Sequence, residues 1–276
     1  LPPLSRGSFS PMTDARPRWT ALVLAGQRPG IDPMAAHFGT DMKALIPVAG
    51  ELMLNRVLEA LLDAPEVARV VVLAQDVQQL RNHRELAWAV AEPRVAFHVS
   101  GRTISGSVRA AVDDPATGLP VLVTTADNVM LTPATIAEFT AGAGAGDVSV
   151  AFVERRNLES AVGPNRRTWL TFRDGAFTGA NLFALTGPGA RNALTFWEKV
   201  EADRKSVLRL AAHFGPVLMV KLLLRRMTLT QALAAAGAKL GASAAPMVLS
   251  DGRMGVDVDK PEDHALAERL LGASRA

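Results

Sequence analysis

The sequence predicts an α/β protein of three layers, α/β/α, with a mostly parallel central sheet and a helical insertion. Short runs rich in valine and leucine alternate with segments whose apolar residues recur at helical spacing. These runs are apolar throughout, as expected of strands that are covered on both faces. With 276 residues, 49% of them hydrophobic, the chain can bury a core large enough for one such domain.

Strands and helices are expected to alternate from residue 20 to residue 155. The strands are predicted at 20–26, 68–75, 94–100, 119–127 and 147–155, and the helices between them at 52–64, 77–90, 104–114 and 132–142. Thr132 and Pro133 suit the N-cap and the first position of the last of these helices. In a sheet of this order, ligands bind where the carboxyl ends of the strands meet the following loops.

The rest of the chain departs from this alternation. We expect a disordered leader at 1–18 and one domain at 19–276, within which 186–245 is a helical insertion. The insertion is expected to shape an acceptor site or a homodimer interface. After it, a strand, a turn and a closing helix follow at 247–271.

Composition and charge exclude several classes of protein. The formal charge of +3 arises from 30 basic and 27 acidic residues, and no sustained basic tract is present, so nucleic-acid binding is not expected. The absence of cysteine excludes disulfides and thiolate metal sites and is typical of a cytoplasmic protein, as we expect here.

The longest apolar run in the C-terminal half is "PVLMVKLLLRRM". It is too short and too charged to cross a bilayer, because Lys221 interrupts it and Arg225 and Arg226 end it, so no transmembrane segment is expected. Its leucines are suited either to a lipid surface or lipid-linked substrate, or to burial in the core. Burial is the interpretation we favour, because such runs are commonly buried.

The loop after the first strand is a candidate anion site. Leu24 and Ala25 end the strand, and the loop then carries Gly26, Gln27, Arg28 and Gly30, with Lys43 before the next apolar stretch. Glycine lets backbone N–H groups approach a phosphate closely, and the two cations suit a triphosphate. A tight turn with two solvated cations explains this loop equally well when it is considered alone.

Carboxylates follow two other strands. Asp127 ends the strand at 119–127, where it suits a Mg²⁺ ligand or the start of an Asx turn. In "GVDVDKPEDHALAERL", alternation puts Asp257 and Asp259 on one face of a short strand. We expect Asp259 to bind metal and leave Asp257 undecided, whereas Glu262 and Asp263 suit the capping of the closing helix.

Two weaker patterns complete the candidate site. "SGRTISGSVRAAV" presents Gly101, Arg102 and Ser107 at the start of a helix, where the serine suits either a ligand contact or an N-cap. "FTGANLFAL" places Gly179 and Asn181 before an apolar strand, as a substrate contact or a turn.

The glycine-rich segment 140–147 follows a helix and precedes a strand, so it is interpreted as a connecting loop. The five histidines show no metal-ligand spacing.

Taken in order, these segments resemble the nucleotidyltransferases with a Rossmann-like sheet of the GT-A type. That family includes sugar-phosphate nucleotidyltransferases, molybdenum-cofactor guanylyltransferases and methylerythritol-phosphate cytidylyltransferases. The resemblance lies in "LVLAGQRPG…MKALIPVAGELML", "SGRTISGSVRAAV", "LVTTADNVMLTP" and "VDKPEDHALAE". It covers residues 19–184 and 247–271. The family's "GGxGxRMG" is here "GQRPG", with fewer glycines.

The resemblance implies a reaction and a set of roles. An NTP, with CTP or GTP favoured, would transfer its NMP to a phosphorylated small molecule such as a sugar or polyol phosphate, with Mg²⁺ or Mn²⁺ as cofactor and pyrophosphate as product. Lys43 and Arg28 would be catalytic, and Asp127, Asp259 and Asp257 would serve the metal. Nucleotide binding would fall to Leu24, Ala25, Gly26, Gln27, Gly30, Gly101, Arg102 and Ser107, and acceptor binding to Gly179 and Asn181.

Two other classes of protein stay open on the sequence. A metal-dependent glycosyltransferase that uses an NDP-sugar can share the sheet and the aspartates, but it releases no pyrophosphate. A non-catalytic nucleotide-binding module would account for the glycine-poor loop.

Overall fold

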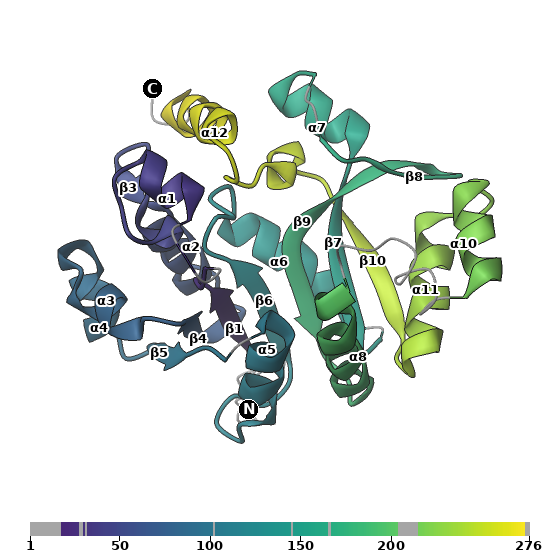
Figure 1. Cartoon of the computed structure of the whole chain (residues 1–276), viewed down its shortest axis with the longest axis horizontal. Helices are drawn as coiled ribbons and strands as arrows, with labels where there is room; N and C mark the ends of the chain where they lie inside the picture. The colour runs from purple at the N-terminus through teal and green to yellow at the C-terminus, as the bar shows by residue number, and fades with distance from the viewer. Residues whose placement is uncertain are drawn as a thin grey trace, which may run out of the picture.

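The computed structural model describes residues 18–27, 30, 32–101, 103–144, 146–164, 167–203 and 215–273. Within these ranges the chain forms an eight-stranded mixed sheet with helices on both faces, together with a short two-stranded pair (Figure 1). Arg28, Arg102 and nearly all of the expected leader lie outside the described residues.

The elements follow the predicted alternation. The strands are β1 (Trp19–Leu24), β2 (Pro47–Val48), β3 (Glu51–Leu52), β4 (Val67–Ala74), β5 (Val95–Val99), β6 (Val121–Thr125), β7 (Val148–Glu154), β8 (Leu170–Phe172), β9 (Gly175–Leu185) and β10 (Ala244–Leu249). The helices are α1 (Pro33–His37), α2 (Met53–Leu62), α3 (Val77–Asn82), α4 (Ala87–Ala91), α5 (Ile104–Asp113), α6 (Pro133–Gly142), α7 (Arg155–Val162), α8 (Gly189–Asp203), α10 (Pro216–Leu223), α11 (Leu229–Leu240) and α12 (Pro261–Ala273), with 3₁₀ turns at Lys43–Leu45, Arg84–Leu86 and Gly252–Gly255.

The strand order places β1 near the centre of the sheet. The order is β10-β7-β9-β6-β1-β4-β5, with β8 beside β9, and β1 is parallel to both β4 and β6. Successive residues of β1 face opposite layers. Ala21 and Val23 pack in the larger core with α2, α6 and α12, whereas Leu22 packs with α5 and α8 on the other face (Figure 1). The predicted three-layer class with a mostly parallel sheet is confirmed.

The sheet contains a reversed strand. β9 lies between β6 and β7 and is antiparallel to both, with Leu122 opposite Ala184. Gly179 and Asn181, expected to precede this strand, lie within it, where the pairing with β7 shifts register and Asn181 takes a φ of 46°. The glycine and asparagine therefore mark a bulge rather than a turn, because a bulge lets the strand continue past them.

Two predicted elements differ in detail. The helix expected at 77–90 is broken at His83, whose extended backbone (ψ 125°) separates α3 from a 3₁₀ turn and α4. The strand expected around Asp257 is not formed, although Val256 and Val258 are buried and the aspartates between and after them are not. The Val258 N–H instead donates to the Asp127 carbonyl at 3.3 Å, so the segment is fixed by the loop after β6.

The region 186–245 is largely helical in its described parts, up to Ala244, where β10 begins. α8 packs against α5, and α11 packs against β10. The apolar run in α10 is not buried, contrary to the interpretation favoured above: the exposed fractions are 52% for Val220, 83% for Leu223 and 55% for Leu224. Local hydrophobicity predicted the helix but not its side-chain exposure. No helix in the described ranges is both long and apolar enough to span a bilayer.

Candidate active site

The loop after β1 makes hydrogen bonds to β4 and to the residue that follows it. Ala25 N–H donates to the Leu73 carbonyl at 2.9 Å, and Gln27 N–H donates to Gln75 Oε1 at 2.9 Å. A Cβ on Gly26 would lie 2.6 Å from the same Gln75 Oε1, so a larger residue here would displace the end of that side chain. The backbone amides of Ala25 and Gln27 are thus hydrogen-bonded within the protein, and of these two only that of Gln27 belongs to the loop expected to face a phosphate.

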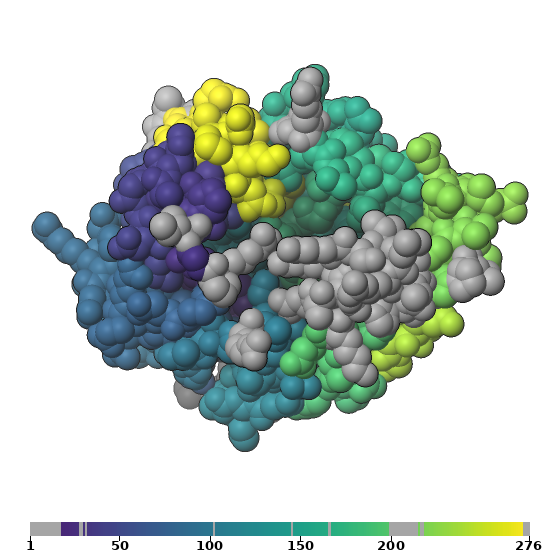
Figure 2. Space-filling view, viewed as in Figure 1, coloured from purple at the N-terminus to yellow at the C-terminus, as the bar shows by residue number. Residues whose placement is uncertain are grey.

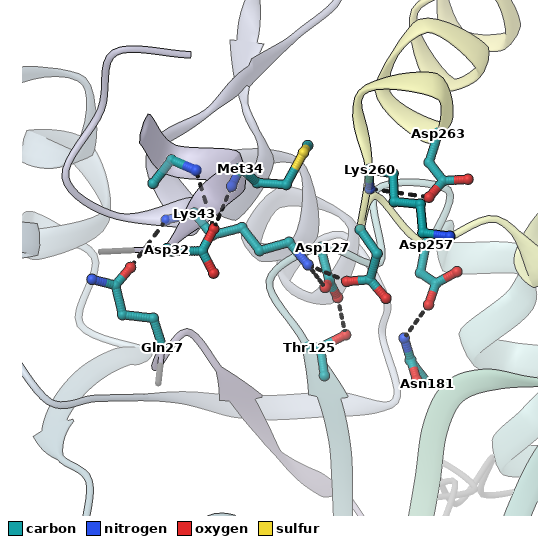
Figure 3. A network of polar contacts seen from close by, with 12 residues as sticks. Gln27, Asp32, Met34, Lys43, Thr125, Asp127, Asn181, Asp257, Lys260 and Asp263 are labelled. Atoms are coloured by element: carbon teal, nitrogen blue, oxygen red, sulfur yellow. Dashed lines mark hydrogen bonds and ion pairs between the residues drawn. The ribbon is translucent and has the colours of Figure 1, made fainter. Parts of the chain in front are cut away.

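The Gln27 side chain connects this loop to the segment that carries Lys43. Its Nε2 donates to the Asp41 carbonyl at 2.9 Å, and its Oε1 accepts from Lys43 N–H at 3.4 Å (Figure 3). The 3₁₀ turn Lys43–Leu45 follows at once, with Ala44 and Leu45 buried. Gln27 therefore positions the backbone of Lys43, a role that the sequence pattern did not indicate.

Lys43 lies between two carboxylates. Its Nζ donates to Asp127 Oδ2 at 2.5 Å and also to Asp259 Oδ1. Thr125, the last residue of β6, donates its hydroxyl to the other oxygen of Asp127 at 2.5 Å (Figure 3). Asp259 reaches this point because Val258 is hydrogen-bonded to the Asp127 backbone. The structure thus brings together three of the predicted site residues.

The charges in this cluster support one another. Burial alone lowers the pKa of Lys43, but the nearby carboxylates of Asp127 and Asp259 outweigh it and raise that pKa above its ordinary value. Burial alone raises the pKa of Asp259, but the hydrogen bond and charge of Lys43 outweigh it, so this pKa is lowered. The ammonium and the Asp259 carboxylate are therefore both ionised at neutral pH.

The donor set fits a hard divalent cation. The carboxylates of Asp127 and Asp259 converge on one positive group, and Mg²⁺ is usually held by one or two carboxylates together with substrate phosphates. In the described part of the chain, no group of three or more His, Cys, Asp or Glu is arranged to hold a metal ion. The site therefore fits a metal that takes its remaining ligands from a bound phosphate and from water.

Asp257 is occupied by other partners. Arg167 Nη2 lies 2.8 Å from Asp257 Oδ1, and Asn181 Nδ2 donates to Asp257 Oδ2 at 3.4 Å (Figure 3). The Arg167 side chain is only 12% exposed, and its Nε is buried without a hydrogen-bond partner. Burial raises the pKa of Asp263 nearby, although the Arg167 charge opposes this. Asp257 and Asn181 thus form a second cluster beside the Lys43 cluster, with Arg167 as its cation.

Two residues of these clusters were missed from the sequence. Asn128 is buried, and its Nδ2 donates to Thr124 Oγ1 and to the Ala180 carbonyl, both at 3.1 Å. It thereby joins the loop that carries Asp127 to the bulge that carries Asn181. Its position directly after Asp127 was the available signal. Arg167 lies in an irregular segment after α7, where no periodicity indicated a role.

The segment around Ser107 is held by its own backbone contacts. The Ser107 hydroxyl donates to the Thr103 carbonyl at 2.7 Å and accepts from Gly101 N–H at 2.9 Å. The N-cap of α5 is Thr103, which accepts from Gly106 N–H, so the alternative of Ser107 as N-cap is wrong. Ser107 shapes the Gly101 turn at the carboxyl end of β5, and its contact with a nucleotide stays a prediction.

The sequence matches a known family over most of its length. The family described as the MobA-like NTP transferase domain matches residues 21–245. This range contains the loop after β1, Lys43, Asp127 and Asn181, but ends before Asp259. The bifunctional enzyme IspD/IspF of Clavibacter michiganensis is 33% identical over 131 residues, which is 45% of this chain and 30% of that enzyme. The chain therefore matches under a third of that relative's length.

Solved structures share the fold. A hypothetical transferase from Thermus thermophilus is 31% identical, with a TM-score of 0.74 over 90% of this chain and 99% of that one. The 4-diphosphocytidyl-2C-methyl-D-erythritol synthase of Anaerococcus prevotii is 10% identical, with a TM-score of 0.51 over 93% of this chain and 96% of that one, a likeness of fold alone. Because the family match covers 21–245, the chain belongs to the MobA-like NTP transferase domain family, a family of nucleotidyltransferases.

Proposed function

We propose that this protein transfers the NMP group of an NTP, with CTP and GTP as the first candidates, to a phosphorylated small molecule such as a sugar or polyol phosphate. The observation that carries the proposal is the convergence of Lys43, Asp127 and Asp259 at the ends of β1 and β6. Open α/β sheets bind their ligands at this edge. Membership of the family indicates that one ligand is an NTP.

The chemistry requires little covalent participation by the protein. An oxygen of the acceptor phosphate forms a new bond to the α-phosphorus in line, and the bond from that phosphorus to the β-phosphate oxygen breaks, so pyrophosphate leaves. A phosphate monoester is largely dianionic at neutral pH, because its second pKa is about 6, and its attack therefore needs no general base. Positioning and charge neutralisation then dominate catalysis.

The chain's residues divide this work. Lys43 would stabilise the charge that grows on the α-phosphate, and Arg28 would bind the β- and γ-phosphates. Gly26 and Gly30 would contact the triphosphate, while Ala25, Gly101 and Ser107 would contact base or ribose. Asp127 and Asp259 would hold Mg²⁺ or Mn²⁺, which when bound supplies charge to the phosphate oxygens.

A screen for pyrophosphate release tests the proposal. Each of the four NTPs is incubated with Mg²⁺ and a panel of sugar and polyol phosphates, and the product is identified by mass. Pyrophosphate release that needs both an NTP and an acceptor, and that is lost in Lys43→Ala, supports the assignment. NDP release from an NDP-sugar without pyrophosphate assigns the glycosyltransferase alternative instead. Saturable NTP binding with no turnover for any acceptor assigns a binding module.

A further inference from the structure

The region around α10 differs in charge from the rest of the molecule. From Arg204 to Ser250 the chain has seven Lys or Arg residues and no Asp or Glu, although the whole chain has 30 basic and 27 acidic residues. The rest of the chain is therefore net acidic. In the described part of this stretch, Lys221, Arg225, Arg226 and Lys239 are all exposed.

Apolar side chains are exposed among these cations. Val220, Leu223 and Leu224 are each more than half exposed. Together with Lys221, Arg225 and Arg226 they form what we call the α10 surface. α10 projects at the right-hand edge of the molecule, away from β1 and β6 (Figures 1 and 2). Contiguous exposed apolar residues of this kind usually mark an interaction site.

The end of α10 fixes the position of its arginines. Arg226 N–H donates to the Lys221 carbonyl, and Arg225 N–H donates to the Leu222 carbonyl, both at 2.9 Å. These two bonds form a Schellman motif, a helix C-cap in which the left-handed residue is usually glycine. Here Arg225 takes the left-handed conformation, with a φ of 51°. The backbone thus holds two cations directly after the exposed Leu223 and Leu224.

We propose that the α10 surface binds the surface of an anionic lipid bilayer. Such a surface matches both features, because its headgroups attract Lys and Arg while its acyl boundary accepts exposed aliphatic side chains. A second copy of this chain fits poorly, since a two-fold contact through this stretch would bring together two basic surfaces with no carboxylate from either. A nucleic acid would leave the leucines without partners, and the α10 surface offers no aromatic ring for base stacking.

Vesicle sedimentation tests this proposal independently of the nucleotidyltransferase reaction. The full chain is mixed with vesicles of phosphatidylcholine alone, or with a third of the lipid replaced by phosphatidylglycerol, at low and high salt. We expect binding to the anionic vesicles only, and weaker binding at high salt. Because each cation near such a surface is worth about fivefold in partitioning, Lys221→Gln with Arg226→Gln should weaken binding about 25-fold.

Matched variants separate the apolar from the ionic contribution. Leu223→Ser with Leu224→Ser should weaken partitioning on the order of tenfold or more. Lys239→Gln, an exposed cation on α11, and Leu170→Ser, a half-exposed leucine on β8, should leave it within about twofold. All variants should retain the wild-type circular dichroism, because the replaced side chains are exposed.

Several results would overturn the proposal. These are equal binding to neutral and anionic vesicles, no binding to either, and unchanged binding of the Leu223/Leu224 variant. Self-association in solution that the Leu223/Leu224 variant abolishes would assign the α10 surface to a second copy instead. Pyrophosphate release measured without vesicles reports on the proposed function alone, so either proposal can fail without the other.

Discussion

The ammonium of Lys43 lies 2.5 Å from Asp127 Oδ2, although the two residues follow different strands of the sheet (Figure 3). The same ammonium also donates to Asp259, from the C-terminal part of the chain. The lysine is therefore held in place by the protein before any substrate binds. Preorganised charge of this kind is the largest contribution to many enzymatic rate enhancements.

Replacing Lys43 with alanine is expected to lower the turnover number about 10²- to 10³-fold, the usual cost of losing one preorganised electrostatic contact. The measurement is the steady-state rate of pyrophosphate release at saturating NTP and acceptor. Lys260→Ala is the matched control, because Lys260 is an exposed lysine next in sequence to Asp259. If the Lys43→Ala enzyme retains the wild-type rate, Lys43 has no catalytic role in the reaction.

The aspartates are expected to divide into metal ligands and a positioning residue. Asp127→Asn should abolish Mg²⁺-dependent turnover and weaken Mn²⁺ binding, because it removes a ligand charge. Asp257→Asn should retain Mn²⁺ binding, because Arg167 and Asn181 already occupy that carboxylate. Mn²⁺ titration followed by electron paramagnetic resonance, with a non-hydrolysable NTP analogue present, measures both variants.

The exposed Asp113 provides the control for this series, since its partner is Arg191, remote from the site. Asp113→Asn should bind Mn²⁺ as the wild type does. Loss of Mn²⁺ binding in Asp257→Asn would instead make Asp257 a third ligand, which would require it to leave Arg167.

The stabilising effect of Lys43 should depend on pH in a defined direction. Its folded pKa is raised above 10.5, so its contribution is present below that value and is lost as the pH rises through the folded pKa. The folded pKa of Asp259 is lowered from 3.8, so its contribution is present above that value and is lost as the pH falls through the folded pKa.

Urea unfolding in metal-free buffer checks this dependence. The difference in free energy of unfolding between the wild type and Lys43→Met should stay constant from about pH 5 to 9 and shrink as the pH is lowered from 5 to 2. Lys260→Met should show no such change. A wild-type advantage that grows at low pH would contradict the assignment of the Lys43–Asp259 pair.

The parts of this molecule that were predictable depend on local pattern. Apolar runs bounded by polar residues indicated the strands, and parallel strands end at one edge, which placed Asp127 near the loop after β1. The direction of β9 was not predictable, because an apolar strand has the same pattern in either direction. The exposure of Leu223 was missed for a similar reason, since hydrophobicity reports what a side chain prefers and not which neighbours the fold supplies.

The contacts within the site were predicted only in part. The aspartates and the lysine have recognisable positions relative to strands, whereas Gln27 and Arg167 act through partners that are remote in sequence. A hydrogen bond such as that from Val258 to the Asp127 carbonyl depends on the assembled fold and leaves no trace in local composition. The sequence therefore identified the charged groups, and the structure identified the contacts that hold them in position.

Asn128 is expected to be important for stability. Its buried Nδ2 donates hydrogen bonds to Thr124 Oγ1 and to the Ala180 carbonyl. Asn128→Ala removes these bonds and leaves buried acceptors unpaired, which should cost about 1–3 kcal/mol in the free energy of unfolding. Asn82→Ala, at an exposed asparagine of α3, should cost under about 0.5 kcal/mol. Equal losses in the two variants, measured by urea unfolding, would contradict a structural role for the Asn128 bonds.

Arg167 is expected to affect the acceptor rather than the nucleotide. Its guanidinium is largely buried and pairs with Asp257, which also contacts Asn181. Figure 3 shows Asp257 and Asn181 on the side of the site away from Gln27. Arg167→Leu should raise the KM for the phosphorylated acceptor at least tenfold and leave the KM for NTP within about twofold, because an arginine–phosphate contact is charge-assisted. Arg191→Leu, which removes a half-exposed ion pair with Asp113, should change neither constant. If Arg167→Leu lowers thermal stability but leaves both KM values unchanged, Arg167 only anchors the segment that carries Asp257, and the acceptor phosphate must bind elsewhere.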